Sequence, residues 1–111
     1  MIKRGTWAEI NLGNIKDNFY AIKETLKDTT KVCCVIKADA YGHGAVKVAE
    51  MLEAENVDYL AVARFEEAIE LRENGIKTPI LCLGYVCEDD VREAAEKNIT
   101  LTIYSLDMAK I

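Results

Sequence analysis

Between residues 31 and 111 the chain alternates four times between a short apolar run and a longer segment with helical spacing of apolar residues. The apolar runs are KVCCVIK (31–37), YLAVA (59–63), PILCLG (79–84) and TLTIY (100–104). Their length and their content of Val and Ile favour strands that are buried on both faces. An order of strand, helix, strand predicts a parallel α/β sheet with right-handed crossover helices.

The first 30 residues follow a different pattern. TWAEINL (6–12) alternates apolar and polar residues, which predicts a strand, and residues 14–26 have the spacing of an amphipathic helix. We therefore expect an N-terminal strand and helix in residues 1–30, then about four βα units in residues 31–111. A (β/α)8 barrel needs about 250 residues. The expected fold is thus the N-terminal part, about half, of a TIM-type barrel, and the 111-residue chain is expected to be a fragment.

The composition indicates which kinds of partner the protein binds and in which compartment it lies. The net charge of −5 disfavours nucleic acid and anionic membranes, which reward clustered Lys and Arg. No window of the sequence approaches the roughly 20 apolar residues of a membrane span. The N-terminus has a basic start without an apolar core after it, unlike a secretory signal. These features predict a cytoplasmic protein.

The four cysteines are not spaced like metal ligands. Cys33 and Cys34 are adjacent and would point to opposite faces of a strand, while Cys82 and Cys87 lie far away in the sequence. The single histidine, His43, completes no zinc-binding spacing with them. We expect reduced thiols, no metal site and no disulfide framework.

The stretch VIKADAYGHG (35–44) carries the strongest chemical signal. Lys37 ends an apolar run, where burial of an unpaired ammonium group is costly, so such a lysine is commonly neutralised, paired or used chemically. Parallel α/β folds collect ligands at the carboxyl ends of their strands. Val35 shares the face of Lys37, and Tyr41 supplies a hydroxyl donor nearby. A lysine at a strand end also commonly extends its amine to solvent, so position by itself leaves both readings open.

VIKADAYGHG resembles the motif that carries the pyridoxal phosphate (PLP) lysine of the alanine racemases. TWAEINL near the start of the chain, and then YLAVAR, EEAIELRENGI and PILCLGY after the motif, resemble other segments of that family, in order and at matching spacing. The family consists of fold-type III PLP enzymes with an N-terminal (β/α)8 barrel and a C-terminal β domain. The resemblance covers essentially this whole chain and implies a partial barrel domain over residues 1–111, with the C-terminal β domain absent.

The resemblance assigns roles to four residues. Lys37 corresponds to the catalytic lysine, which binds PLP covalently as an internal aldimine and then acts as the base associated with the D-enantiomer. Tyr41 corresponds to the tyrosine that contacts the PLP phosphate, and Leu83 to an apolar residue beside the cofactor. Val35 is a further candidate for the wall of the cofactor site.

The implied function is the interconversion of L-alanine and D-alanine, which supplies D-alanine for peptidoglycan. Complete family members are homodimers, and their second base is a tyrosine from the partner subunit's C-terminal domain. No residue of this chain corresponds to that base, so the chain alone is expected to be inactive. Two alternatives stay open: a non-catalytic PLP-binding barrel of the cofactor-homeostasis type, and a racemase for serine or another amino acid.

Neighbouring polar residues have simpler interpretations. His43 is expected to belong to the loop and helix start, and Asp39 to shape a turn. Arg64, at the end of the second apolar run, is a candidate for lining the pocket, with helix capping or a surface ion pair as the alternative. The charged runs FEEAIELRE (65–73) and EDDVREAAEK (88–97) are expected to be solvated helix faces.

Overall fold

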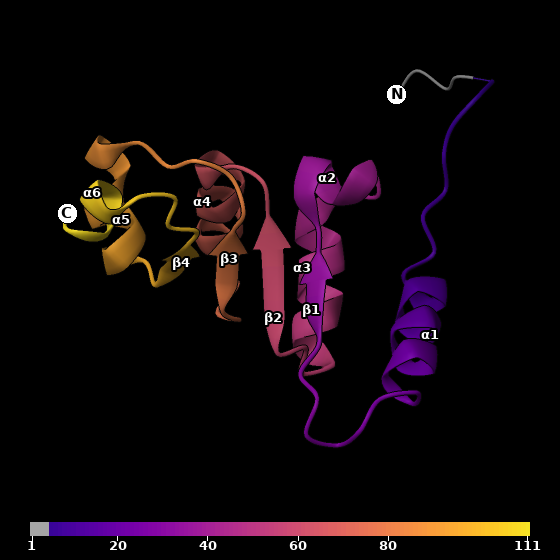
Figure 1. Cartoon of the computed structure of the whole chain (residues 1–111). Helices are drawn as coiled ribbons and strands as arrows, with labels where there is room; N and C mark the ends of the chain where they lie inside the picture. Colours follow the sequence, from indigo (N-terminus) through magenta and orange to yellow (C-terminus); the bar gives the residue numbers. More distant parts are fainter. Residues whose placement is uncertain (1–4) are drawn as a thin grey trace.

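The computed structural model describes residues 5–111, which alternate between helices and short strands (Figure 1). In chain order the elements are α1 (Leu12–Lys23), β1 (Cys33–Val35), α2 (Lys37–Tyr41), α3 (Ala45–Ala54), β2 (Tyr59–Val62), α4 (Phe65–Glu73), β3 (Ile80–Cys82), α5 (Glu88–Glu96), β4 (Ile99–Leu101) and α6 (Leu106–Ala109). This order confirms the alternation of strands and helices predicted for residues 31–111.

The four strands form one parallel sheet in the order β1-β2-β3-β4. The register aligns Val35 with Ala61, Ala61 with Leu81, and Leu81 with Thr100 across the sheet. Each strand is therefore followed by a helix that returns the chain to the same end of the sheet, as a parallel connection requires. The carboxyl ends of all four strands consequently lie along one edge.

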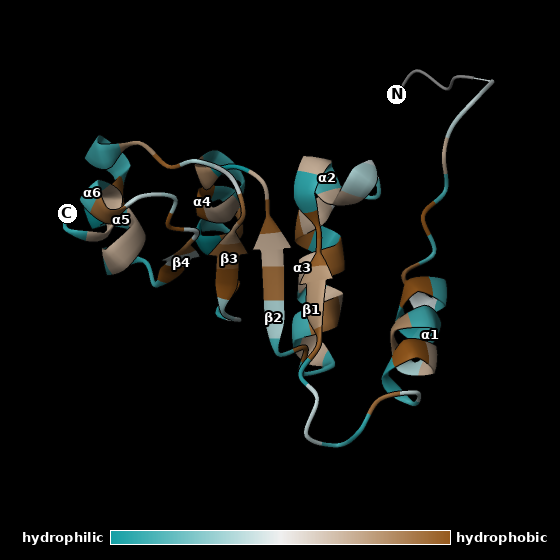
Figure 2. Ribbon diagram, viewed as in Figure 1, coloured by the Kyte–Doolittle hydropathy of each residue, from teal (hydrophilic) through white to brown (hydrophobic). Residues whose placement is uncertain are grey.

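Helices cover one face of the sheet and form the core with it. In Figure 1, α3 and α4 lie behind the strands, and Figure 2 shows that the strands are mainly hydrophobic. The buried side chains on this face alternate along the strands, and they include Leu60, Val62, Ile80, Cys82 and Ile99. This alternation explains the apolar runs of the sequence, because every second residue of a strand faces the helices.

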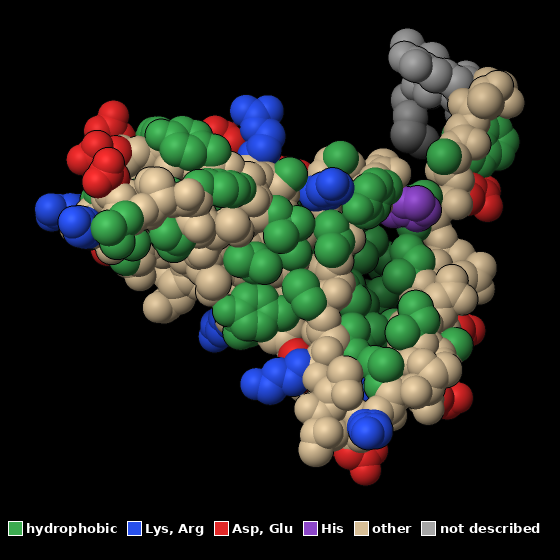
Figure 3. All heavy atoms as spheres, viewed as in Figure 1, with side chains coloured by type: hydrophobic (Ala, Val, Ile, Leu, Met, Phe, Trp, Pro, Cys, Tyr) green, Lys and Arg blue, Asp and Glu red, His purple; other side chains and the backbone are tan. Residues whose placement is uncertain are grey.

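The opposite face of the sheet is not covered by helices. Val35 and Leu83 are 41% and 39% exposed, and Figure 3 shows hydrophobic side chains gathered over this face. Tyr59 and Thr100 also lie here, and their hydroxyl oxygens are 2.7 Å apart in a hydrogen bond that spans β2 to β4. In a barrel this face would be the interior.

Three helices are followed by a residue with left-handed backbone. Asn56, Asn98 and Gly75 have φ values of 60°, 56° and 84° and lie just after α3, α5 and α4. Left-handed residues at these positions end a helix, and Asn and Gly adopt that conformation most readily. Asn74 and Gly75 thus end α4.

The N-terminal strand prediction is wrong, and the four predicted apolar runs correspond to strands that are shorter than the runs themselves. Residues 6–12 form no strand: residues 6–11 are extended, and α1 begins at Leu12. An extended segment becomes a strand only through a partner, and within residues 5–111 none pairs with it. The strand predicted at 31–37 ends at Val35, where a turn begins, and the strand predicted at 100–104 is Ile99–Leu101.

The helix α1 lies at the β1 side of the sheet and packs on α3 (Figure 1). Phe19 is buried against the core. Lys16 Nζ lies 2.9 Å from Oε1 of Glu55, the residue that follows α3. Neither α1 nor any other helix among residues 5–111 has the length and apolar content needed to cross a bilayer.

Candidate functional site at the carboxyl edge of the sheet

Lys37 lies just beyond β1, at the edge where the carboxyl ends of the strands meet. The last ladder bond before it joins the Ile36 N–H to the Ala61 carbonyl oxygen at 2.8 Å. The side chain of Lys37 is half-buried. Ion pairs within residues 5–111 involve Lys16, Lys47, Arg64 and Lys97, and none involves Lys37. In the described part of the chain, its amine is therefore not neutralised by a carboxylate.

The short element α2 (Lys37–Tyr41) is a turn with left-handed backbone and not a right-handed α-helix. Ala38, Asp39, Ala40 and Tyr41 have φ values of 50°, 56°, 55° and 56°. Left-handed helical backbone costs roughly 1–2 kcal/mol per residue for residues other than glycine. A run of four such residues persists only if surrounding contacts hold it, and strained backbone of this kind clusters at functional sites.

Hydrogen bonds from its own loop hold the far end of this turn. The Ala45 N–H donates to Asp39 Oδ1 at 2.7 Å, and the Gly44 N–H donates to the Asp39 carbonyl oxygen at 2.9 Å. His43 Nδ1 lies 3.0 Å from the carbonyl oxygen of Ala40. Asp39 thus shapes the turn and caps the start of α3, and His43 belongs to the loop, as the sequence predicts.

Tyr41 ends the left-handed turn with its side chain 60% exposed. Gly42 follows with φ 89°, a conformation that favours glycine. Lys37 and Tyr41 are therefore carried by one short turn that is fixed at both ends. The structure places the predicted amine and the predicted hydroxyl donor on the same element.

The register of the sheet relates the two apolar candidates to each other. Val35 aligns with Ala61 and Leu81, and Leu83 follows two residues after Leu81. Lys37 follows Val35 beyond the last paired residue of β1. Val35 and Leu83 therefore lie on the uncovered face, near the carboxyl edge that carries Lys37.

The loop after Leu83 depends on a glycine that sequence reasoning did not single out. The Leu83 N–H donates to the Val62 carbonyl oxygen at 2.8 Å, and the Gly84 N–H donates to that of Ala63 at 2.9 Å. A Cβ atom on Gly84 would lie 2.2 Å from the Ala63 carbonyl oxygen. Only glycine allows β2 and β3 to approach this closely beside Leu83.

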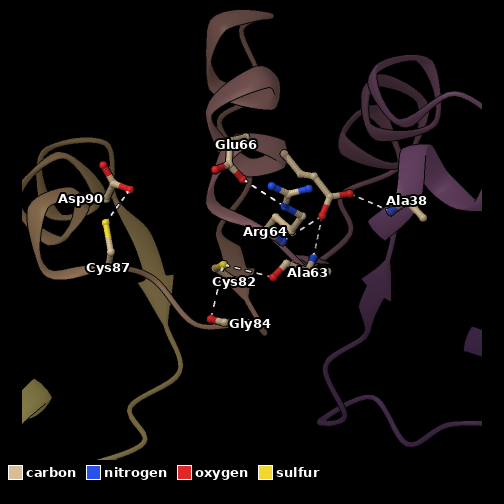
Figure 4. A network of polar contacts seen from close by, with 9 residues as sticks. Ala38, Ala63, Arg64, Glu66, Cys82, Gly84, Cys87 and Asp90 are labelled. Atoms are coloured by element: carbon tan, nitrogen blue, oxygen red, sulfur yellow. Dashed lines mark hydrogen bonds and ion pairs between the residues drawn. The ribbon is translucent and has the colours of Figure 1, made fainter.

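A second feature missed in the sequence is Glu67 of α4. Its Oε2 accepts a hydrogen bond of 2.7 Å from the Ala38 N–H, and its Oε1 accepts from the N–H groups of Ala63 and Arg64 at 3.0 and 2.8 Å (Figure 4). The prediction that residues 65–73 form only a solvated face is therefore wrong at Glu67. A glutamate three residues after a helix N-cap was the available signal.

Arg64 does not extend into the candidate site. Its side chain is 75% exposed, and its Nε lies 3.3 Å from Glu66 Oε2 (Figure 4). This is the surface ion pair that the sequence left as the alternative. Such exposed pairs contribute little to stability.

Three of the four thiols are poor nucleophiles. Burial raises the pKa of Cys33, of Cys34 and of Cys82 above the ordinary value of 9.0. These three cysteines are therefore protonated at neutral pH, and protonated thiols are poor nucleophiles. All four cysteines are free, as the sequence predicts.

An apolar groove lies beside β1, between α1, α3 and the strand edge, and is visible as a hollow in Figure 3. Phe19, Ile36 and Leu52 are among the residues that line it. Of the four candidate residues, Val35 borders the groove, while Lys37, Tyr41 and Leu83 do not. The groove is thus a feature of the open strand edge, and it touches the turn that carries the lysine at Ala40.

Fold and site together define a parallel α/β unit of the (β/α)8 type, with a lysine at the carboxyl edge of its first strand. The family model "Alanine racemase, N-terminal domain" matches residues 10–111, and the chain belongs to this family.

Relatives cover nearly the whole chain. The alanine racemase of Methanococcus maripaludis is 46% identical over 98% of this chain, and alanine racemase 1 of Caldanaerobacter subterraneus is 49% identical over 96% of it. The solved alanine racemase of Clostridium difficile 630 is 55% identical over 99% of the chain, with a TM-score of 0.93. The alanine racemase of Bacillus anthracis with bound L-Ala-P is 36% identical, with a TM-score of 0.91.

The matches reach across only part of these relatives. The chain covers 29% of the Methanococcus maripaludis protein and 29% of the Clostridium difficile chain. The fold prediction is confirmed, because the four strands and their helices match the N-terminal part of the alanine racemase barrels.

Proposed function

We propose that this chain supplies the cofactor-binding lysine of a PLP-dependent alanine racemase, and that Lys37 is this lysine. The observation that carries the proposal is the position of Lys37 at the carboxyl edge of a parallel sheet, on a left-handed turn that also bears Tyr41. Active sites of (β/α)8 barrels lie at this edge. Family membership supports the assignment, since the relatives carry the name alanine racemase.

The donor set around Lys37 fits PLP. A primary amine suits covalent capture of an aldehyde, a hydroxyl group suits the phosphate, and exposed apolar side chains suit the faces of an aromatic ring. Lys37, Tyr41, Val35 and Leu83 provide these groups at or beside the same edge. When bound, PLP withdraws electrons from the substrate and makes its α-proton acidic.

Each of these residues has a distinct role in the proposal. The amine of Lys37 holds the cofactor and, once released, moves a proton at the α-carbon of alanine. The Tyr41 hydroxyl donates a hydrogen bond to the phosphate group. Val35 and Leu83 exclude water from the ring, which strengthens the electrostatic interactions of the site.

Racemisation requires proton transfer on two faces of the α-carbon, and Lys37 serves one of them. The second proton donor lies outside this chain in our proposal, in the C-terminal domain of the partner subunit of a homodimer. The 111-residue chain alone is therefore expected not to racemise alanine. The biological role that we propose for the complete protein is the cytoplasmic supply of D-alanine for peptidoglycan.

Two other functions would use the same lysine. A non-catalytic PLP-binding barrel of the cofactor-homeostasis type would hold the cofactor without moving a substrate proton. A racemase for serine or another amino acid would differ in its substrate pocket. The names of the relatives favour alanine as the substrate.

The first test asks which lysine captures PLP. The purified chain is incubated with PLP and reduced with borohydride, and the modified peptides are quantified by mass spectrometry. We expect about a tenfold preference for Lys37 over the other lysines, equivalent to about 1.4 kcal/mol. The Lys37→Arg variant should lose this preferred site while its other lysines react as before. Equal modification of all exposed lysines would contradict the assignment.

A further inference from the structure

The backbone on both sides of Lys37 is tied to the neighbouring β2–α4 unit. On the preceding side, the Ile36 N–H donates to the Ala61 carbonyl oxygen of β2 at 2.8 Å. On the following side, the Ala38 N–H donates to Glu67 Oε2 of α4 at 2.7 Å. The lysine therefore stands between two hydrogen bonds that reach across to the next βα unit.

The two carboxylate oxygens of Glu67 have different tasks. Oε1 accepts from the N–H groups of Ala63 and Arg64, which begin the turn into α4 and need an acceptor. Oε2 accepts from Ala38, which belongs to the turn after β1. A helix cap needs the first oxygen alone, whereas the second oxygen links the lysine-bearing turn to α4 (Figure 4).

The hydrogen bond between Ala38 and Glu67 lies where the left-handed backbone begins. Ala38 is the first residue of the left-handed run, with φ 50° and ψ 50°. The strand ladder has ended two residues earlier, so a different acceptor must satisfy the Ala38 N–H. Asp39 holds the far end of the turn through Ala45, and Glu67 holds its start.

We propose that Glu67 is a positioning residue for Lys37. By fixing the Ala38 peptide, its carboxylate sets the direction in which the lysine side chain leaves the sheet edge. The inference rests on the proposed function for the role of Lys37, and it adds the residue that orients this lysine. A carboxylate bond to a backbone N–H is charge-assisted and stronger than a neutral one, which suits a turn under strain.

The Glu67→Gln variant separates the two tasks. A glutamine has one acceptor oxygen, and facing that oxygen toward Ala63 and Arg64 preserves two hydrogen bonds. Its NH2 group then faces the Ala38 N–H, and two donors cannot bond. The matched control is Glu66→Gln, the same change at the adjacent residue, whose carboxylate pairs with Arg64 at the surface.

Two measurements on the full chain test the proposal. The first is amide hydrogen exchange of Ala38 by NMR, which we expect to be about tenfold faster in Glu67→Gln, a change of about 1.4 kcal/mol in opening free energy. The second is the share of PLP trapped on Lys37 after borohydride reduction, relative to the other lysines. Unfolding would also make all lysines react alike, so the ratio is compared under conditions in which circular dichroism shows Glu67→Gln and Glu66→Gln to be as folded as the wild type.

The results distinguish the positioning role of Glu67 from the proposed function of Lys37. Faster Ala38 exchange together with a loss of Lys37 selectivity in Glu67→Gln, with Glu66→Gln unchanged, supports the positioning role. Selective wild-type labelling that Glu67→Gln leaves intact overturns that role and preserves the proposed function. If wild-type labelling shows no preference for Lys37, the proposed function fails at this residue. Unchanged Ala38 exchange in Glu67→Gln would then overturn the positioning role as well, and faster exchange would support Glu67 as the anchor of the Lys37 backbone.

Discussion

The guanidinium group of Arg72, near the end of α4, joins two loops that precede strands. It donates to the carbonyl oxygens of Ile76 and Thr78 at 2.8 Å each, and to those of Lys97 and Asn98 at 2.8 and 2.9 Å. A planar guanidinium presents several donors in a fixed arrangement, which a lysine ammonium group does not match. Arg72 thereby fixes where β3 and β4 enter the sheet.

Replacing Arg72 by lysine should therefore destabilise the fold although the charge is kept. Several carbonyl oxygens lose their donor, and we expect the free energy of unfolding to fall by about 3 kcal/mol. Urea unfolding followed by circular dichroism measures the change. The control is Arg92→Lys on the exposed side of α5, and an equal loss in both variants would contradict the role of Arg72.

Glu53 of α3 makes the free energy of unfolding depend on pH in the acidic range. Its Oε2 accepts from the N–H groups of Lys77 and Thr78 at 2.7 Å each, and from the Thr78 hydroxyl at 2.8 Å. Burial raises the pKa of Glu53, but these hydrogen bonds outweigh burial and bring the pKa below its ordinary value of 4.5. A lowered pKa in the folded state stabilises the fold above the ordinary value, and this contribution is lost as the pH falls through the lowered pKa.

We therefore expect the free energy of unfolding to decrease as the pH falls below the ordinary value of 4.5, with a smaller decrease in the Glu53→Gln variant. Urea unfolding at a series of pH values measures both slopes. The control is Glu50→Gln on the same helix, which removes a carboxylate but leaves the hydrogen bonds of Glu53 in place. Identical slopes for wild type and Glu53→Gln would contradict this account.

At the scale of elements, the turn after β3 controls Leu83. Gly84→Ala would place its Cβ atom against the Ala63 carbonyl oxygen, so the two strand ends must separate. We expect a loss of about 1–3 kcal/mol in the free energy of unfolding, typical of overpacking. We also expect NMR shifts at Leu83 and Ala63. Gly5→Ala, where nothing lies within 4 Å of the added atom, should leave both unchanged.

The elements also show how far the sequence predicts this fold. Helices α3, α4 and α5 follow from apolar periodicity, because each buries one face against the sheet. The left-handed turn after Lys37 does not follow, since Ala, Asp and Tyr do not favour that backbone on their own. Contacts from Glu67 and Asp39, residues that the sequence pattern assigns to a helix face and a turn, stabilise it.

At the scale of the candidate site, the local sequence predicts which residues form the site better than it predicts the distant residues that hold them in place. The motif at 35–44 indicates Lys37 and Tyr41 directly, because both belong to one short segment. Glu67 is 29 residues from Ala38 in the sequence, and only the parallel pairing of β1 with β2 brings them together. The need for Gly84 likewise arises from the close approach of β2, which no local pattern encodes.

The whole molecule has one sheet face covered by helices and one face that bears the candidate site. This chain aligns to 29% of the Clostridium difficile alanine racemase with a TM-score of 0.93, so we expect a chimera in which it takes the place of that part to fold. The proposed function predicts that the remaining part supplies what this chain does not contain. Such a chimera tests Lys37 in a complete barrel.

The most direct measurement is alanine racemisation by this chimera, loaded with PLP and followed from both enantiomers. We expect interconversion of L-alanine and D-alanine, and its loss in the Lys37→Ala and Lys37→Arg variants, because neither side chain can hold the cofactor or transfer the proton. A folded, PLP-loaded chimera that leaves alanine unchanged, or one that stays active without Lys37, would contradict the assignment of Lys37 as the catalytic lysine of an alanine racemase.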